Sequence, residues 1–148
     1  MAAVSSPVPS PGLVIRYSYL WESEARQGRE EGVKDRPCAI VLVILREGEH
    51  PIVRALPVTH TAPSNPADAL EIPPETKTRL GLDAERSWVI LTEANDFIWP
   101  GPDLRPLPGR HPSTVAYGFL PPGFMRVLRQ RLEQRWRQRR PRIVGRTE

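Results

Sequence analysis

Three residues in the first half of the sequence have side chains suited to phosphate binding and proton transfer. Arg36 precedes Pro37 at the start of an apolar run, and Thr59 and His60 follow the next apolar run. A guanidinium is planar, always charged and able to form two parallel hydrogen bonds with a phosphate. A hydroxyl can bond a phosphate oxygen, and an imidazole exchanges protons near neutral pH. Spacing alone nevertheless favours a surface arginine at a strand start and an ordinary turn threonine.

The geometry of a strand sets a condition on this trio. Adjacent residues of a strand point to opposite faces, so Thr59 and His60 can reach one site only if the strand ends between them. His60 is the third catalytic candidate on that condition. The other two histidines, His50 and His111, lie in turn-like stretches and are expected to be solvated.

The positive charge of the chain is concentrated in its C-terminal segment. Residues 123–148 hold nine arginines and two glutamates (+7), whereas residues 1–122 hold 12 basic and 15 acidic residues (−3), which together give the net charge of +4. One strongly positive element on a mildly acidic body indicates a polyanion or an acidic partner. Arg129 and Arg135 are the candidate contacts for nucleic acid in this segment. A solvated arginine-rich helix face is the plain alternative.

Two further residues are candidate contacts for a nucleic acid. Trp99 stands in a stretch rich in proline and glycine, where an exposed ring could stack on a base. Glu31 lies in the charged loop before Arg36 and is also a candidate contact for a nucleic acid, although a solvated carboxylate explains it equally well. Trp88 lies inside an expected strand and is assigned to the core.

Five short segments have the composition of β-strands. They are apolar and β-branched, and polar or proline-containing turns separate them: 13–21, 37–45, 51–58, 69–72 and 87–92. The second and third are joined by a short polar turn, which predicts an antiparallel hairpin. The chain contains 18 prolines in 148 residues, far above the usual share of about 5%, which favours short strands and irregular loops over long helices.

Two helices are predicted between and after these strands. Pro73 and Pro74 can open a short helix that runs to Leu80 and stops at Gly81. A second helix begins after Pro121-Pro122 and ends before Pro141, with one apolar stripe formed by Met125, Leu128, Leu132 and Trp136. The stretch 99–113 is expected to be a long loop. The predicted fold class is mainly β (α+β), a small barrel or twisted sheet of short antiparallel strands with a C-terminal helix.

Length and composition set the outer limits. With 148 residues, 39% of them hydrophobic and 26% charged, one globular domain is expected, with a flexible leader 1–11, a domain 12–140 and a tail 141–148. Cys38 is the sole cysteine, which excludes a disulfide framework and leaves it as a core residue. We expect neither a metal nor a cofactor. The start of the chain does not resemble a signal peptide and no apolar stretch is long enough to span a membrane, so a cytoplasmic protein is expected.

The order of local signals resembles the MazF/PemK family of toxin-antitoxin ribonucleases. Members begin with a glycine and an alternating strand, continue through a Gly/Glu loop to an Arg-Pro pair and a β-branched strand, and end the next strand in a Pro-x-Thr turn. The similar segments here are Gly12 to Tyr17, Gly28 to Gly32, Arg36-Pro37 with 39–45, and Pro57-Val58-Thr59. Later matches are Gly81-Leu82 before the strand at 87–91, and Gly118-Phe119-Leu120 before the last helix. The resemblance covers roughly residues 12–136.

The resemblance implies an SH3-like barrel of about five to seven strands, commonly a homodimer, that cuts single-stranded RNA without a metal and is covered by an acidic antitoxin. It implies Arg36 and Thr59 as active residues. Such cleavage uses the RNA 2′-hydroxyl as nucleophile and would spare DNA. The alternative is a non-catalytic member of the same fold that binds nucleic acid, or a protein target such as gyrase.

Overall fold

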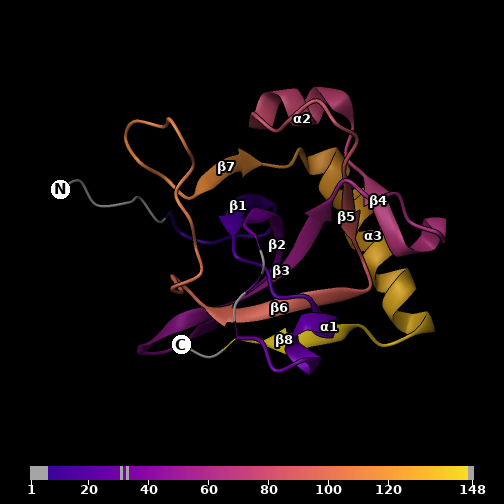
Figure 1. Cartoon of the computed structure of the whole chain (residues 1–148), viewed down its shortest axis with the longest axis horizontal. Helices are drawn as coiled ribbons and strands as arrows, with labels where there is room; N and C mark the ends of the chain where they lie inside the picture. Colours follow the sequence, from indigo (N-terminus) through magenta and orange to yellow (C-terminus); the bar gives the residue numbers. More distant parts are fainter. Residues whose placement is uncertain (1–6, 31, 33, 147–148) are drawn as a thin grey trace.

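The computed structural model describes residues 7–30, 32 and 34–146, and within them eight strands and four short or long helices. In chain order these are β1 (Leu13–Tyr17), α1 (Glu22–Arg26), β2 (Arg36–Arg46), β3 (Glu49–Thr59), η1 (Pro66–Asp68), β4 (Ala69–Glu71), α2 (Pro74–Leu80), β5 (Trp88–Ile90), β6 (Glu93–Ile98), β7 (Ala116–Phe119), α3 (Pro122–Gln138) and β8 (Arg142–Gly145) (Figure 1). The predicted class, mainly β with a C-terminal helix, is confirmed.

The strands form one sheet, with β3 at its centre. The order is β4-β5-β3-β2-β1-β7, and β6 pairs with β3 and with β8. The first half of β3 pairs with β6 and its end pairs with β5, so β5 and β6 follow each other along the same edge of β3. In the described part of the chain β4 and β7, at the two ends of the path, do not pair with each other, and the sheet is therefore open. Each of these strands is followed closely by a Pro-Pro pair, and proline has no N–H to extend a ladder.

The β2–β3 hairpin is the longest pairing in the molecule and confirms the sequence prediction. Its turn uses Gly48 at a φ of 72°, a backbone conformation that glycine adopts without strain. The register pairs Cys38 with Pro57. Arg36, two residues before Cys38, therefore lies beside Thr59, two residues after Pro57, and this places the start of β2 against the end of β3.

The two faces of the sheet bury different side chains. Alternation along β1 sends Val14 into a cluster that packs against α3 through Met125 and Leu128, and sends Ile15 into a second cluster. The single cysteine, Cys38, belongs to the second cluster and is fully buried. Burial raises the pKa of its thiol above the ordinary value, so the thiol is uncharged.

Three strands (β6, β7 and β8) and two short helices (α1 and η1) were not expected. Residues 18–21 leave the sheet after β1. At the start of α1, a carboxylate oxygen of Glu24 accepts a hydrogen bond of 3.1 Å from the Trp21 amide.

The β6 segment carries polar residues, which hide its strand character from a search for apolar alternation. Its Asn95 side chain is fully buried, accepting a hydrogen bond from the Leu20 amide and donating one to the Leu20 carbonyl.

The expected tail 141–148 is corrected by the structure. Residues Arg142–Gly145 form β8, which runs parallel to β6, and Figure 1 shows the two strands side by side. Arg146 is buried and forms an ion pair with Asp103 at 3.0 Å and a hydrogen bond to the Ser18 carbonyl at 2.8 Å. Residues 142–146 are thus part of the packed domain. No helix among the described residues has the length and apolarity needed to cross a membrane.

Candidate active site

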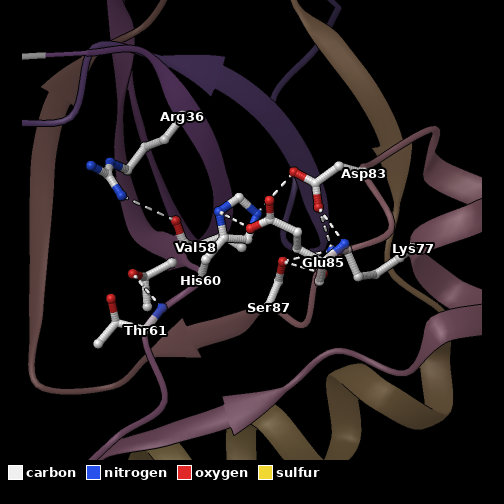
Figure 2. A network of polar contacts seen from close by, with 9 residues as sticks. Arg36, Val58, His60, Thr61, Lys77, Asp83, Glu85 and Ser87 are labelled. Atoms are coloured by element: carbon white, nitrogen blue, oxygen red, sulfur yellow. Dashed lines mark hydrogen bonds and ion pairs between the residues drawn. The ribbon is translucent and has the colours of Figure 1, made fainter.

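A cavity of about 470 Å³ opens where β2 begins and β3 ends. Its wall comes from both strands, from Trp21 just before α1, and from the segment between α2 and β5. All three predicted catalytic residues, Arg36, Thr59 and His60, line it. Figure 2 shows the polar contacts around this cavity.

Arg36 occupies the first position of β2 and is only partly buried. Its guanidinium lies 4.8 Å from the centre of the Trp21 ring. Nη1 donates a long hydrogen bond of 3.4 Å to the Val58 carbonyl oxygen, and the buried Nε has no hydrogen-bond partner among the described residues. The side chain is therefore held by stacking and by one weak hydrogen bond.

Arg36 has no carboxylate partner among the described residues, whereas two other partly buried arginines each have one. Arg54 binds Asp96 and Arg135 binds Asp68, each at 2.8 Å. For Arg36 no carboxylate oxygen lies within 4.0 Å in the described ranges. A guanidinium that is oriented but not neutralised is suited to an anionic ligand.

Thr59 is the last residue of β3, and its side chain helps to end the strand. Its Oγ1 accepts a hydrogen bond of 3.2 Å from the Thr61 amide, a local turn that competes with strand pairing. His60 therefore lies outside the strand, and the alternation of strand faces no longer applies to it. The condition set by the sequence is met, and Thr59 and His60 line the same cavity.

His60 lies between two carboxylates. Nε2 is 2.8 Å from Asp83 Oδ2 and Nδ1 is 3.3 Å from Glu85 Oε2 (Figure 2). A protonated ring can donate to both carboxylates, whereas a neutral ring has only one N–H. Both ring nitrogens are thus engaged, and the contact of Nδ1 with Glu85 is the longer of the two.

A buried lysine fixes the segment that carries these carboxylates. Lys77 of α2 is 4% exposed, and its Nζ donates to Asp83 Oδ1 at 2.8 Å, to Ser87 Oγ at 2.7 Å and to the Glu85 carbonyl. Partial burial acts to raise the pKa of Asp83, but the hydrogen bond from Lys77 and the neighbouring His60 outweigh it and lower that pKa. Three acceptors use all three ammonium hydrogens, so Lys77 has no lone pair with which to activate the Ser87 hydroxyl.

The structure does not bring the other predicted contacts into this cavity. Trp99 is 5% exposed and packs beside Phe97, so its expected stacking on a base is wrong for this conformation because no ring face is open. Arg135 is engaged by Asp68, as described above. Glu31 lies outside the described residues.

Arg129 is exposed on a different flank of α3. It lines a small space with Val41, Met125 and Leu128, away from the cavity of Arg36. The residues that sequence reasoning missed are Trp21, Lys77 and Asp83. The sequence places Trp21 at the end of the expected strand 13–21, and nothing in the local pattern marks Lys77 as buried.

Comparison with protein-family models, with curated proteins and with solved structures found no match. The similarity to toxin ribonucleases seen in the sequence stays a prediction. The function therefore has to be inferred from the cavity itself.

Proposed function

We propose that the protein is a metal-independent endoribonuclease of the toxin type that cleaves single-stranded RNA in the cavity of Arg36. The observation that carries the proposal is the meeting of Arg36, Thr59 and His60 in one cavity. These residues come from two strand ends that lie far apart in the sequence.

The charges around the cavity favour a phosphate at Arg36. Asp83 is neutralised by Lys77 and His60, and Asp35 lies 3.6 Å from both Arg16 and Arg105. Both carboxylates of the lining thus have cationic partners, whereas Arg36 has no carboxylate within the part of the chain that is described. An incoming phosphate meets two lining cations, Arg36 and Lys34, for which the described residues supply no carboxylate partner.

The reaction requires only the RNA and the side chains of the cavity. The 2′-hydroxyl oxygen bonds to the adjacent phosphorus and loses its proton to water or to a carboxylate of the cavity. The bond from phosphorus to the 5′-oxygen breaks, and the products are a 2′,3′-cyclic phosphate and a free 5′-hydroxyl. Arg36 stabilises the charge on the non-bridging oxygens, and Thr59 hydrogen-bonds one of them. His60 stays bonded to Asp83 through Nε2, and its Nδ1, which exchanges the longer contact with Glu85 for the substrate, protonates the leaving 5′-oxygen.

The test compares purified variants on single-stranded RNA and on DNA of the same sequence. Wild-type protein should cut RNA at discrete places, leave DNA intact and need no metal, because DNA lacks the 2′-hydroxyl. Arg36→Gln should lose cleavage, and Arg79→Gln should not. Arg79 is an exposed arginine of α2 that lies outside the cavity, so it controls for the loss of one charge.

Induced expression in a bacterial host gives the matching test in cells. Growth arrest with fragmented RNA that Arg36→Gln abolishes supports the proposal. Intact RNA and normal growth with well-expressed, folded protein would refute it. That result would favour the alternative, a non-catalytic module that binds nucleic acid or a protein target such as gyrase. A homodimer and an acidic antitoxin are further predictions from the resemblance, and sedimentation and co-purification test them.

A further inference from the structure

Two other cavities continue from the cavity of Arg36 along the surface. A bridging cavity of about 400 Å³ shares Trp21, Thr59 and Thr61 with the first. An arginine cavity of about 470 Å³ shares Asp68 and Thr92 with the bridging cavity. Because neighbouring cavities share wall residues, the three lie next to one another from Arg36 to the C-terminal end of α3, and we call this series of cavities the groove.

The far end of the groove is strongly positive. The arginine cavity is lined by Arg135, Arg139, Arg140 and Arg142, with Asp68 as its one carboxylate, so four positive charges and one negative charge give a local charge of +3. Asp68 is engaged by Arg135 at 2.8 Å, and Arg142 lies 3.8 Å from Glu93. Arg139 and Arg140 are exposed and have no carboxylate within 4.0 Å in the described ranges.

The position of these arginines matters for what they can bind. The C-terminal end of a helix carries a partial negative charge, which stabilises arginines there but also repels an anion. The guanidinium groups of Arg139 and Arg140, which have no carboxylate partner in the described part of the chain, outweigh this partial charge of about half an elementary charge. An anionic ligand is therefore the expected occupant of the arginine cavity.

The bridging cavity between the two positive ends is uncharged apart from Asp68. It presents hydroxyls of Thr59, Thr61 and Ser64 beside the apolar surface of Pro63 and Ile90. Hydroxyl and apolar groups side by side suit the sugars and bases of a nucleic acid, which need few fixed charges. The groove thus alternates a phosphate site, a neutral stretch and a second phosphate site.

We propose that single-stranded RNA lies along this groove, with the scissile phosphate at Arg36 and a second, distant phosphate bound by Arg139 and Arg140. This inference rests on the proposed function and deepens it, since it assigns the course of the substrate beyond the cleaved bond. Arg139 and Arg140 are then affinity residues that take no part in the chemistry.

Binding of fluorescent single-stranded RNA, followed by anisotropy over a range of salt concentrations, tests the proposal. The probes are oligouridylates of 4 and 20 nucleotides, and the proteins are the wild type, the double variant Arg139→Gln/Arg140→Gln and the control Arg126→Gln/Arg137→Gln. The control removes two exposed arginines of α3 that lie outside the groove. Circular dichroism confirms that all three are folded.

The double variant should bind the 20-mer more weakly and with a shallower salt dependence. Each phosphate contact with a single strand contributes about 0.7 to the slope of log K against log salt, so loss of the second phosphate should lower the slope by about 0.7 and weaken binding roughly fourfold at 0.15 M salt. The 4-mer should bind both proteins alike. The control should keep most of the wild-type affinity.

Equal losses in the double variant and the control would overturn the proposal, because charge alone would then explain the effect. Unchanged binding by the double variant would overturn it as well and would point to an acidic protein segment as the ligand of these arginines. Cleavage by the wild type, measured on the same RNA, is read separately. RNA that binds as expected but is never cut would refute the proposed function and leave the groove in place.

Discussion

Replacing Arg36 with methionine should remove activity while leaving stability nearly unchanged. Methionine keeps the length of the side chain and its apolar contact with Trp21 but removes the charge and every N–H. Arg36 was described above as stacked on Trp21 at 4.8 Å, weakly bonded to Val58 and unsatisfied at its buried Nε. These three features determine how much the free energy of unfolding of the variant differs from that of the wild type.

The expected change in stability is a small difference between opposing effects. The loss of the cation–π contact costs about 0.5–2 kcal/mol, and the long hydrogen bond adds about 0.5 kcal/mol to the loss. Removing a buried N–H without a partner returns about 1–3 kcal/mol, and sulfur against the Trp21 ring contributes about 0.3–1.5 kcal/mol. The free energy of unfolding should therefore stay within about 1 kcal/mol of the wild type. Loss of a donor aimed at the reacting phosphate should lower kcat by about 10²–10³-fold.

Urea unfolding followed by circular dichroism gives the stability, since tryptophan fluorescence would respond to the replaced neighbour of Trp21. Initial rates of RNA cleavage give the activity. A loss of more than about 3 kcal/mol would mean that Arg36 holds the β2–β3 junction together, a magnitude typical of core defects. Wild-type cleavage rates in a folded Arg36→Met protein would refute the assignment of the phosphate to this residue.

Three further predictions concern residues outside the phosphate site. Arg146→Ala should cost about 3–5 kcal/mol in urea unfolding because it breaks a buried pair with Asp103, whereas Arg142→Ala, half exposed, should cost less than about 1 kcal/mol; equal effects would contradict the buried role of Arg146. Burial raises the pKa of Glu93 in the folded protein above its ordinary value of 4.5. The contribution of this carboxyl to stability is therefore fully present below pH 4.5 and is lost as the pH rises through the raised pKa of the folded state. The stability gained by Glu93→Gln should accordingly grow from pH 4 to pH 8, and a difference that is flat with pH would argue against this linkage. Lys77→Met should cost about 1–3 kcal/mol, because it removes the buried ammonium that donates to Asp83, to Ser87 and to the Glu85 carbonyl, and should also slow cleavage; stability equal to the wild type would show that Lys77 does not fix this segment.

The sequence predicts the elements whose patterns are local. The β2–β3 hairpin follows from two β-branched runs and a glycine turn, and the expected helix 74–80 coincides with α2. The β6 strand could not be recognised because its polar residues are satisfied from a distance. Asn95 bonds the backbone of Leu20, and Asp96 binds Arg54 of β3. Arg54 and Asp96 are 42 positions apart in the sequence. Polar residues that depend on such distant partners leave no local signal.

The candidate site divides in the same way. Arg36, Thr59 and His60 could be selected from the sequence because the register of one hairpin brings the start of β2 to the end of β3. The positions of Asp83 and Glu85 depend on the segment between α2 and β5, which hydrogen bonds from Lys77 hold in place. Only the folded chain shows where that segment lies. Trp99 illustrates the opposite error. A proline- and glycine-rich neighbourhood indicates an exposed loop, but the ring turns inward beside Phe97.

The burial of Cys38 makes its rate of chemical labelling a measure of how often the sheet opens. It is the sole thiol of the chain, it is closed to solvent in the middle of the sheet, and its raised pKa keeps it in the unreactive protonated form. A thiol reagent can label it only when β2 separates from its neighbours. The labelling rate of the native protein therefore reports how often the central sheet opens. Variants of the groove and of the cavity can be ranked by that rate without attaching any probe.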